Sequence, residues 1–203
     1  TGLVLLLSTL VFWFLVQREK VARQFEAAEL DIQQGQFNSG IKRLEAFLKS
    51  HPNHALSKGA KGARVLHDKA LIEKELAGTP SWPEGLKALK AFVTEHRDEK
   101  YFEDLYADLQ QCAKTIAIGA PKTAAQSKDS SLLELSTEAE QFFDRFSPPE
   151  VPQTEAKLEI AKARADAKAT ILKFNVVTAA FIEIDAALKK ESPFPVAVTR
   201  QKL

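Results

Sequence analysis

A segment of fifteen residues occurs twice in this chain, at a constant offset of 45 positions. Phe37–His51 returns as Trp82–His96, and Gly, Lys, Leu, Ala, Phe and His recur identically at matched places. The matched apolar pairs are Phe37/Trp82, Ile41/Leu86 and Leu48/Val93. A fixed period of ~20–50 residues is typical of stacked supersecondary units. Such units gain a core only by stacking, and they present extended surfaces rather than catalytic pockets. The repeat therefore favours a protein that holds a partner.

Composition indicates an all-α protein of one or two small domains, or one short solenoid. Of 203 residues, 45% are apolar and only 8 are glycine, and Ala, Leu, Lys, Glu and Gln dominate. The 28 basic and 27 acidic residues nearly cancel and are interspersed. Because a nucleic-acid partner needs a basic stripe that displaces counterions, this balance argues against nucleic-acid binding.

The apolar spacing around the first copy of the repeat predicts a pair of helices over residues 21–53. Gly35 ends the first helix, and Pro52 ends the second because proline disfavours helical geometry in the residue before it. The stripes consist of Val21, Phe25, Ala28 and Ile32 in the first helix and Ile41, Leu44, Phe47 and Leu48 in the second.

This pair resembles the tetratricopeptide repeat family in the residues around its turn. The matching positions are Gly35, Phe37, Gly40, Leu44, Phe47-Leu48 and Pro52. Phe47 is larger than the alanine usual in the family, and Gln24 stands where a large apolar residue is usual. The resemblance implies a right-handed stack of helical hairpins whose first helices line a concave face that binds protein segments. The candidate groove residues that it implies are Arg23, Gln24, Ala27, Lys58, Lys61 and Arg64.

We expect four regions along the chain: a membrane anchor at 1–20, two repeat hairpins at 21–96, a third hairpin at 97–147, and a region at 148–203. The last would hold a proline linker, a long Ala-rich helix or helix pair, and the start of a further repeat. The first helix of the second hairpin should run from about Leu56 to Ala77. In the third hairpin, Gly119-Ala120-Pro121 and the polar run to Ser131 should form the loop.

The first residues form an apolar segment, Leu3–Val16, which is followed by Arg18 and Lys20. As a helix it spans about 21 Å, short of a ~30 Å hydrocarbon core. A signal-peptide core and a buried helix fit less well, because no cleavage site follows and no polar face is present. We expect a transmembrane helix that begins upstream of this sequence, with residues 2–16 in lipid. The basic residues after it weakly favour a cytoplasmic body, but a lone anchor with a short tail favours the periplasmic or extracytoplasmic side, which we expect.

Motifs that carry catalysis are absent from the sequence: H-E-x-x-H, a glycine-rich phosphate loop, G-x-S-x-G and a cysteine pair. His51-x-x-His54 can be read as a metal pair, but His51 and His96 share a repeat position at a helix end, where histidine complements the helix dipole. His67-Asp68 should lie on a solvated helix face, and Cys112 on an apolar stripe. We therefore expect no enzyme, cofactor, metal or small-molecule substrate.

Together these features predict a membrane-anchored, tetratricopeptide-like scaffold or adaptor that contacts other proteins of a membrane complex. The layout is similar to single-pass bacterial envelope proteins with a short repeat domain. Two alternatives remain: a structural subunit buried permanently in a larger membrane complex, or a stalk for a further domain. The chain contains no Met and stops within an apparent helix, so we expect more protein on both sides.

Overall fold

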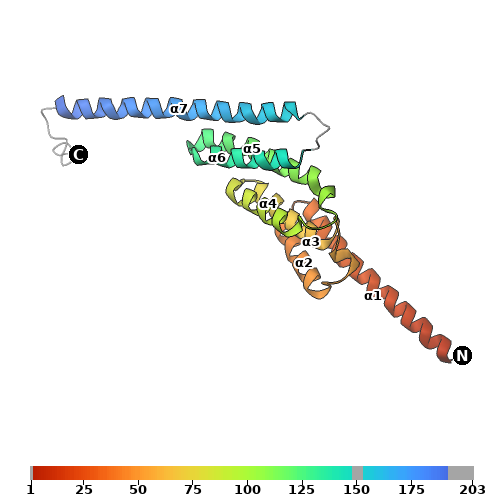
Figure 1. Cartoon of the computed structure of the whole chain (residues 1–203). Helices are drawn as coiled ribbons and strands as arrows, with labels where there is room; N and C mark the ends of the chain where they lie inside the picture. Colours follow the sequence, from red (N-terminus) through yellow and green to blue (C-terminus); the bar gives the residue numbers. More distant parts are fainter. Residues whose placement is uncertain (1, 148–152, 192–203) are drawn as a thin grey trace, which may run out of the picture.

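The computed structural model describes residues 2–147 and 153–191. Within these ranges the chain forms seven α-helices and two short 3-10 helices, which confirms the expectation of an all-α protein (Figure 1). The elements in chain order are α1 (Gly2–Gln33), α2 (Phe37–Ser50), η1 (Ala55–Ser57), α3 (Ala63–Leu76), α4 (Trp82–His96), η2 (Phe102–Leu105), α5 (Tyr106–Ser127), α6 (Ser131–Arg145) and α7 (Thr154–Glu191). From α1 to α6, successive α-helices pack on one another, whereas α7 packs mainly on α5.

The sequence repeat is present in the structure as the helices α2 and α4. Residues 21–96, all of which are described, contain helices and turns and no strand. In both repeat helices the glycine near the start touches the end of the preceding helix. A Cβ on Gly40 would lie 2.5 Å from Ile32 of α1, and a Cβ on Gly85 would lie 2.7 Å from Leu76 of α3. Glycine at these matched places lets each pair of helices approach closely.

The phenylalanines of the two copies occupy equivalent core sites, as the repeat predicts. Phe47 and Phe92 are each 3% exposed. Each ring packs on the histidine one turn later, with ring centroids 5.3 Å apart for Phe47 and His51 and 4.5 Å apart for Phe92 and His96. The two copies therefore share side-chain packing as well as helix boundaries.

The expected first helix of the second hairpin is wrong at its start. Residues 55–57 form only the single turn η1, and α3 begins at Ala63. Gly59 has a φ of 83°, in the left-handed region, and Gly62 is extended. The Ser57 hydroxyl also donates to the carbonyl oxygen of His51 at 2.5 Å, which holds the turn against the end of α2. Two glycines and this hydrogen bond interrupt the helix although the apolar spacing continues through it.

The expected loop at Gly119-Ala120-Pro121 is also wrong, because α5 continues through it to Ser127. A proline inside a helix removes the hydrogen bond to the carbonyl four residues earlier. Here that carbonyl belongs to Ala117, and the buried Ser136 hydroxyl of α6 donates to it at 2.6 Å. The neighbouring helix thus supplies the donor that Pro121 lacks, and the helix persists.

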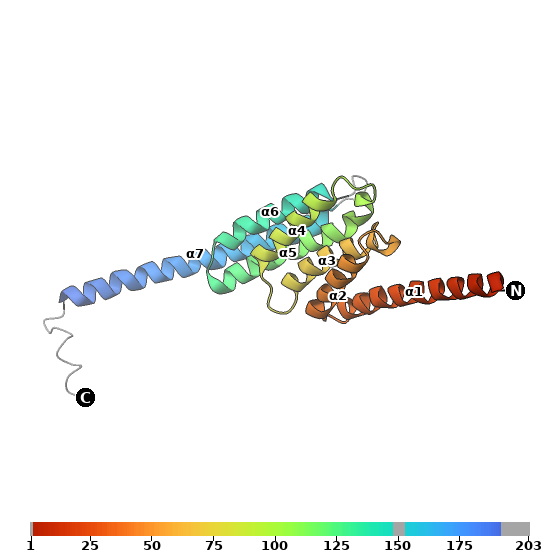
Figure 2. The same cartoon turned by 90° about the horizontal axis from the view of Figure 1, so that it is seen from below.

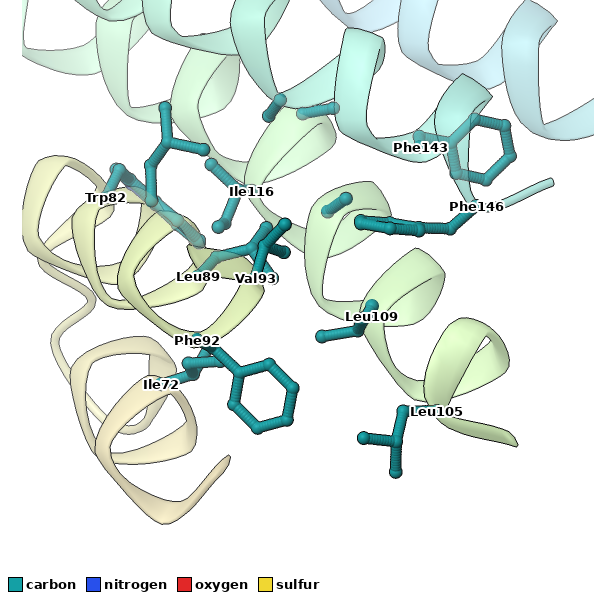
Figure 3. Packing of buried hydrophobic residues seen from close by; sticks show 14 of the residues in the cluster. Ile72, Trp82, Leu89, Phe92, Val93, Leu105, Leu109, Ile116, Phe143 and Phe146 are labelled. Carbon is teal, nitrogen blue, oxygen red and sulfur yellow. The ribbon is translucent and has the colours of Figure 1, made fainter. Parts of the chain in front are cut away.

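Two apolar clusters form the core, and α3 contributes to both. One cluster joins α1, α2 and one side of α3. The other joins the opposite side of α3 to α4, η2, α5, α6 and the start of α7. Figure 3 shows the second cluster, in which Leu89 and Val93 of α4 lie near Ile116 of α5, and Phe92 lies near Ile72 of α3. The hairpins are therefore parts of one continuous packed structure.

Both end helices project from this packed body at opposite ends (Figure 2). α1 is continuous from Gly2 through Val21, as expected. Within the described residues, no helix combines the length and the apolarity needed to cross a bilayer. α7 is one unbroken helix, which resolves the choice between one helix and two. The expected proline linker at 148–152 lies outside the described residues. The expected start of a further repeat, at 194–198, also lies outside them.

Candidate binding cavities

Two cavities lie beside the repeat helices. The larger has a volume of about 390 Å³ and is lined by α2, α3 and α4. The smaller, about 230 Å³, lies between α1 and α2. The larger is lined by Leu48, Arg64, His67, Asp68, Leu71, Ala88, Ala91, Phe92, Glu95 and His96. The smaller is lined by Gln24, Arg43, Ala46, Phe47 and Ser50.

The two cavities are equivalent under the 45-residue repeat. Each of the four α2 residues in the smaller cavity has its repeat counterpart in the wall of the larger one. The pairs are Arg43/Ala88, Ala46/Ala91, Phe47/Phe92 and Ser50/Glu95. Because α2 and α4 present matched residues to them, the duplicated sequence forms two similar cavities. We call these residues and the rest of the two linings the paired-cavity surface.

Each cavity combines an aromatic wall with a small side chain. Phe47 and Phe92 are buried, while Ala46 and Ala91 beside them are exposed. Alanine at these places leaves the cavities open, since a longer side chain there would occupy the space. The arrangement suits an apolar side chain of a partner that enters between the helices.

The larger cavity contains a polar cluster centred on Asp68 of α3. Its carboxylate lies 2.7 Å from Nδ1 of His67 and 2.9 Å from Nε2 of His96 on α4. The other ring nitrogen of His96 lies 3.3 Å from the Tyr101 hydroxyl. Among the described residues, Nε2 of His67 is buried without a hydrogen-bond partner, and a carboxylate oxygen of Glu45 is 3.6 Å away. The cluster connects α3 to the end of α4 across one wall of the cavity.

The electrostatics of this cluster follow from its hydrogen bonds. Burial of Asp68 opposes ionisation, but the hydrogen bonds from His67 and His96 outweigh it and lower the pKa of Asp68 to about 2. The hydrogen bond to Asp68, opposed by burial, raises the pKa of His67, and Glu45 adds to the increase. Asp68 therefore stays ionised in the cavity wall across the neutral range.

This cluster corrects two expectations about histidine. His67-Asp68 is partly buried rather than on a solvated helix face. His96 does lie in the last turn of α4, but its ring contacts Asp68 and Tyr101 instead of the helix carbonyls. Asp68 and His96 are far apart in sequence, and no spacing signals their contact. The sequence marks His96 only through its match to His51 in the repeat, and Asp68 only through its neighbour His67.

The structure distributes the six candidate groove residues over several places. Gln24 lines the smaller cavity and Arg64 the larger one, so these two belong to the paired-cavity surface. Arg23 forms an exposed ion pair with Glu19 one turn earlier. The remaining three are half-buried Ala27 on α1 and exposed Lys58 and Lys61, which precede α3.

Other chemistry-bearing residues have structural contacts. Nδ1 of His54 accepts a hydrogen bond from the Leu56 backbone N–H at 3.2 Å and caps η1. Among the described residues, no group of three or more His, Cys, Asp and Glu side chains is placed to hold a metal ion. Cys112 packs against the core, and burial raises the pKa of its thiol to about 11. A thiol with so high a pKa is a weak nucleophile at neutral pH.

Comparison of the chain with protein-family models, with curated proteins and with solved structures found no match.

Proposed function

We propose that this protein is a helical-repeat scaffold or adaptor that holds another protein on its paired-cavity surface. The observation that carries the proposal is the recurrence of the cavity lining at the repeat interval, from Ala46 and Phe47 to Ala91 and Phe92. A repeated site matches a partner that offers similar side chains at intervals. The resemblance to tetratricopeptide repeats supports the same function.

The lining indicates what such a partner presents. Leu48, Leu71 and Phe92 form an apolar wall in the larger cavity, and Arg64 and Glu95 place charges of both signs around it. Apolar side chains would enter the two cavities, and polar groups would contact the charged residues. A protein segment with alternating apolar and polar side chains fits this lining better than a segment of uniform charge.

We further propose that the start of α1 attaches the scaffold to a membrane. Phe12, Trp13 and Val16 are exposed on a helix that projects from the body. Arg18 and Lys20, also exposed, follow within one turn. This order of apolar residues, an interfacial Trp and then basic residues is typical of a helix at a membrane–water boundary. The attachment would leave the paired-cavity surface free to bind a partner.

Substitution of the two small rim residues tests the partner-binding proposal. Ala46→Glu and Ala91→Glu each place a charged side chain at a cavity, whereas Ala107→Glu makes the same change at an exposed alanine of α5 outside both linings. Each protein is isolated from membranes of the cells that make it, and the proteins that co-purify are quantified. We expect at least about a tenfold loss of the partner for the first two variants, because a buried unpaired charge is costly, and no loss for Ala107→Glu.

The helical circular-dichroism signal serves as the control, because exposed substitutions usually change stability by under ~0.5 kcal/mol. Equal co-purification by all three folded variants would contradict binding at the cavities and would favour the structural-subunit alternative.

Flotation with liposomes tests the membrane attachment separately. The full chain should float with vesicles, and a version that begins at Gln17 should remain in the dense fraction, because it lacks the apolar start of α1. Both should show the same thermal unfolding of the body, since Phe25 is the first buried residue of α1 among the side chains described. Flotation of the shorter version would show that the attachment lies elsewhere.

A further inference from the structure

The C-terminal half of α7 is an exposed helix with many apolar side chains. α5 ends and α6 begins close to Phe174, where Lys128 at the C-terminal end of α5 lies over the Phe174 ring, 5.6 Å from its centroid. α7 continues for about five more turns to Glu191, away from the body (Figures 1 and 2). All its described side chains from 172 to 189 are exposed.

The apolar side chains of this half continue the stripe by which α7 packs on the body. In the first half of α7, the buried residues include Ile160, Ala167 and Ile171. Ile160 and Ala167 are seven residues apart, and this interval continues beyond the body through Phe174, Phe181 and Leu188. Val177 and Ile184 lie between these three at alternating spacings of three and four residues, so that all five share one face of the helix, and all five are exposed. We call these five residues the α7 seam. A heptad stripe of this kind is the surface that one helix presents to another in a coiled coil.

The stripe loses its partner beyond the point where α5 ends and α6 begins, while the stripe itself continues. An isolated helix of this length is marginal in water, and the β-branched residues Val176, Val177 and Ile184 lower its intrinsic stability further. A contiguous apolar stripe on a projecting element marks an interaction surface. Among the described residues, Lys128 lies over the Phe174 ring, and the side chains of the rest of the seam are exposed.

We propose that the α7 seam pairs with the same seam of a second copy of this chain, as a parallel coiled coil. The proposal continues an interface that the chain already uses, the packing of the first half of α7 on α5. It is independent of the proposed scaffold function, because it uses none of the residues of the two cavities.

The residues that flank the seam fit pairing of identical copies. In a parallel pair, Lys173 of one copy faces Thr178 of the other, and Ala180 faces Asp185. Along the described part of the seam no like charges oppose each other, so identical strands meet there without electrostatic repulsion. Few charges are present to select a strongly acidic or basic partner instead. Glu183 and Asp185 lie off the seam, where a coiled coil leaves them in water but a lipid bilayer would have to desolvate them.

Two neighbouring residues of equal exposure provide the test. Phe181 lies in the seam and is 68% exposed, whereas Ile182 lies off it and is 65% exposed. Sedimentation equilibrium of the full chain, in detergent with density matching, measures the mass against the 22.5 kDa of a monomer. We expect the wild-type chain and Ile182→Glu to show a protein mass of two or more copies at micromolar concentration. Phe181→Glu should raise the dissociation constant at least about tenfold, because it places a charge inside the seam.

A cysteine crosslink tests the parallel orientation in the same full-length chain, with Cys112 replaced by alanine. Ile184→Cys should oxidise to a covalent dimer, because the two copies of residue 184 face each other in a parallel pair, and Ile182→Cys should not. A monomeric wild-type chain up to about 100 μM, or equal effects of Phe181→Glu and Ile182→Glu, would overturn the proposal. So would a monomer whose binding to vesicles is lost with Phe181→Glu, since the seam would then contact lipid. Crosslinking at 182 but not 184 would overturn the assigned seam.

Discussion

Contacts of single side chains stabilise parts of this structure that the local backbone preferences disfavour. Pro121 should end a helix, yet the Ser136 hydroxyl satisfies the carbonyl that the proline leaves without a donor. Gly119, two residues earlier, leaves space for the Trp82 ring, and the Trp82 indole N–H donates to the Thr123 hydroxyl at 2.8 Å. Around Pro121, contacts from α4 and α6 therefore maintain α5 where its local sequence favours a break.

The close contact of Gly119 with Trp82 predicts that alanine at this position lowers the stability of the protein, although helix propensity alone favours alanine over glycine. Alanine is favoured over glycine inside a helix by about 1 kcal/mol. A Cβ on Gly119, however, would lie 2.2 Å from the Trp82 ring, and overpacking of this kind costs about 1–3 kcal/mol. Gly119→Ala should therefore lower the melting temperature, by about 2–4 °C for each kcal/mol of net loss. Adding Trp82→Phe should recover part of the loss, while a higher melting temperature of the single variant would show that the ring moves aside.

The Asp68 cluster predicts a pH-dependent contribution to stability. The pKa of Asp68 is lowered to about 2 in the folded protein, so its contribution is present above pH 4 and is lost as pH falls toward 2. The pKa of His67 is raised above 6.5, so its contribution is present below pH 6.5 and is lost as pH rises through the folded value. Asp68→Asn should thus cost most between about pH 4 and 6.5, on the order of 1–3 kcal/mol.

Thermal melts of the wild-type chain and of Asp68→Asn from pH 2.5 to 9 measure this cost. Asp104→Asn, at an exposed position of η2, is the matched control and should have little effect at any pH. A cost for Asp68→Asn that is constant with pH would show that the ionised cluster does not contribute.

At the scale of the helices, the sequence predicted elements whose signals are local. The repeat located α2 and α4, because glycine, leucine and phenylalanine at matched places specify both the helix and its buried face. The start of α3 was missed, because Gly59 and Gly62 interrupt an apolar spacing that continues through them. The length of α5 was missed for a different reason, since the donor for the Ala117 carbonyl comes from α6. A hydrogen bond between two helices produces no periodic pattern in the sequence, so the sequence does not predict it.

The same distinction applies to the cavities. Their α2 and α4 walls are implicit in the repeat, because residues that match in sequence also match in position along the helix face. Their α3 wall could not be predicted, because Asp68 reaches His96 only after α3 and α4 have packed. Of the groove residues taken from family resemblance, Gln24 and Arg64 line cavities, and Lys58 and Lys61 fall in the turn region before α3.

At the scale of the molecule, a packed helical body lies between two projecting helices with exposed apolar residues. α1 and α7 leave the body at opposite ends (Figure 2). The two cavities lie between helices of the repeat region. This layout separates three proposed contacts along one chain: a membrane at the start of α1, a protein partner at the cavities, and a second copy at the α7 seam. A scaffold benefits from such separation because each contact can form without displacing another.

Photo-crosslinking from the two cavities tests most directly whether the repeat builds one binding surface. A benzophenone amino acid replaces Ala46 in one full-length protein and Ala91 in another, and the control carries it at Ala107. After irradiation in membranes of the cells that make the protein, we expect adducts with the same partner polypeptide from Ala46 and Ala91 and none from Ala107. No adduct from either cavity, or the same adducts from all three positions, would contradict a binding surface built from the two repeats.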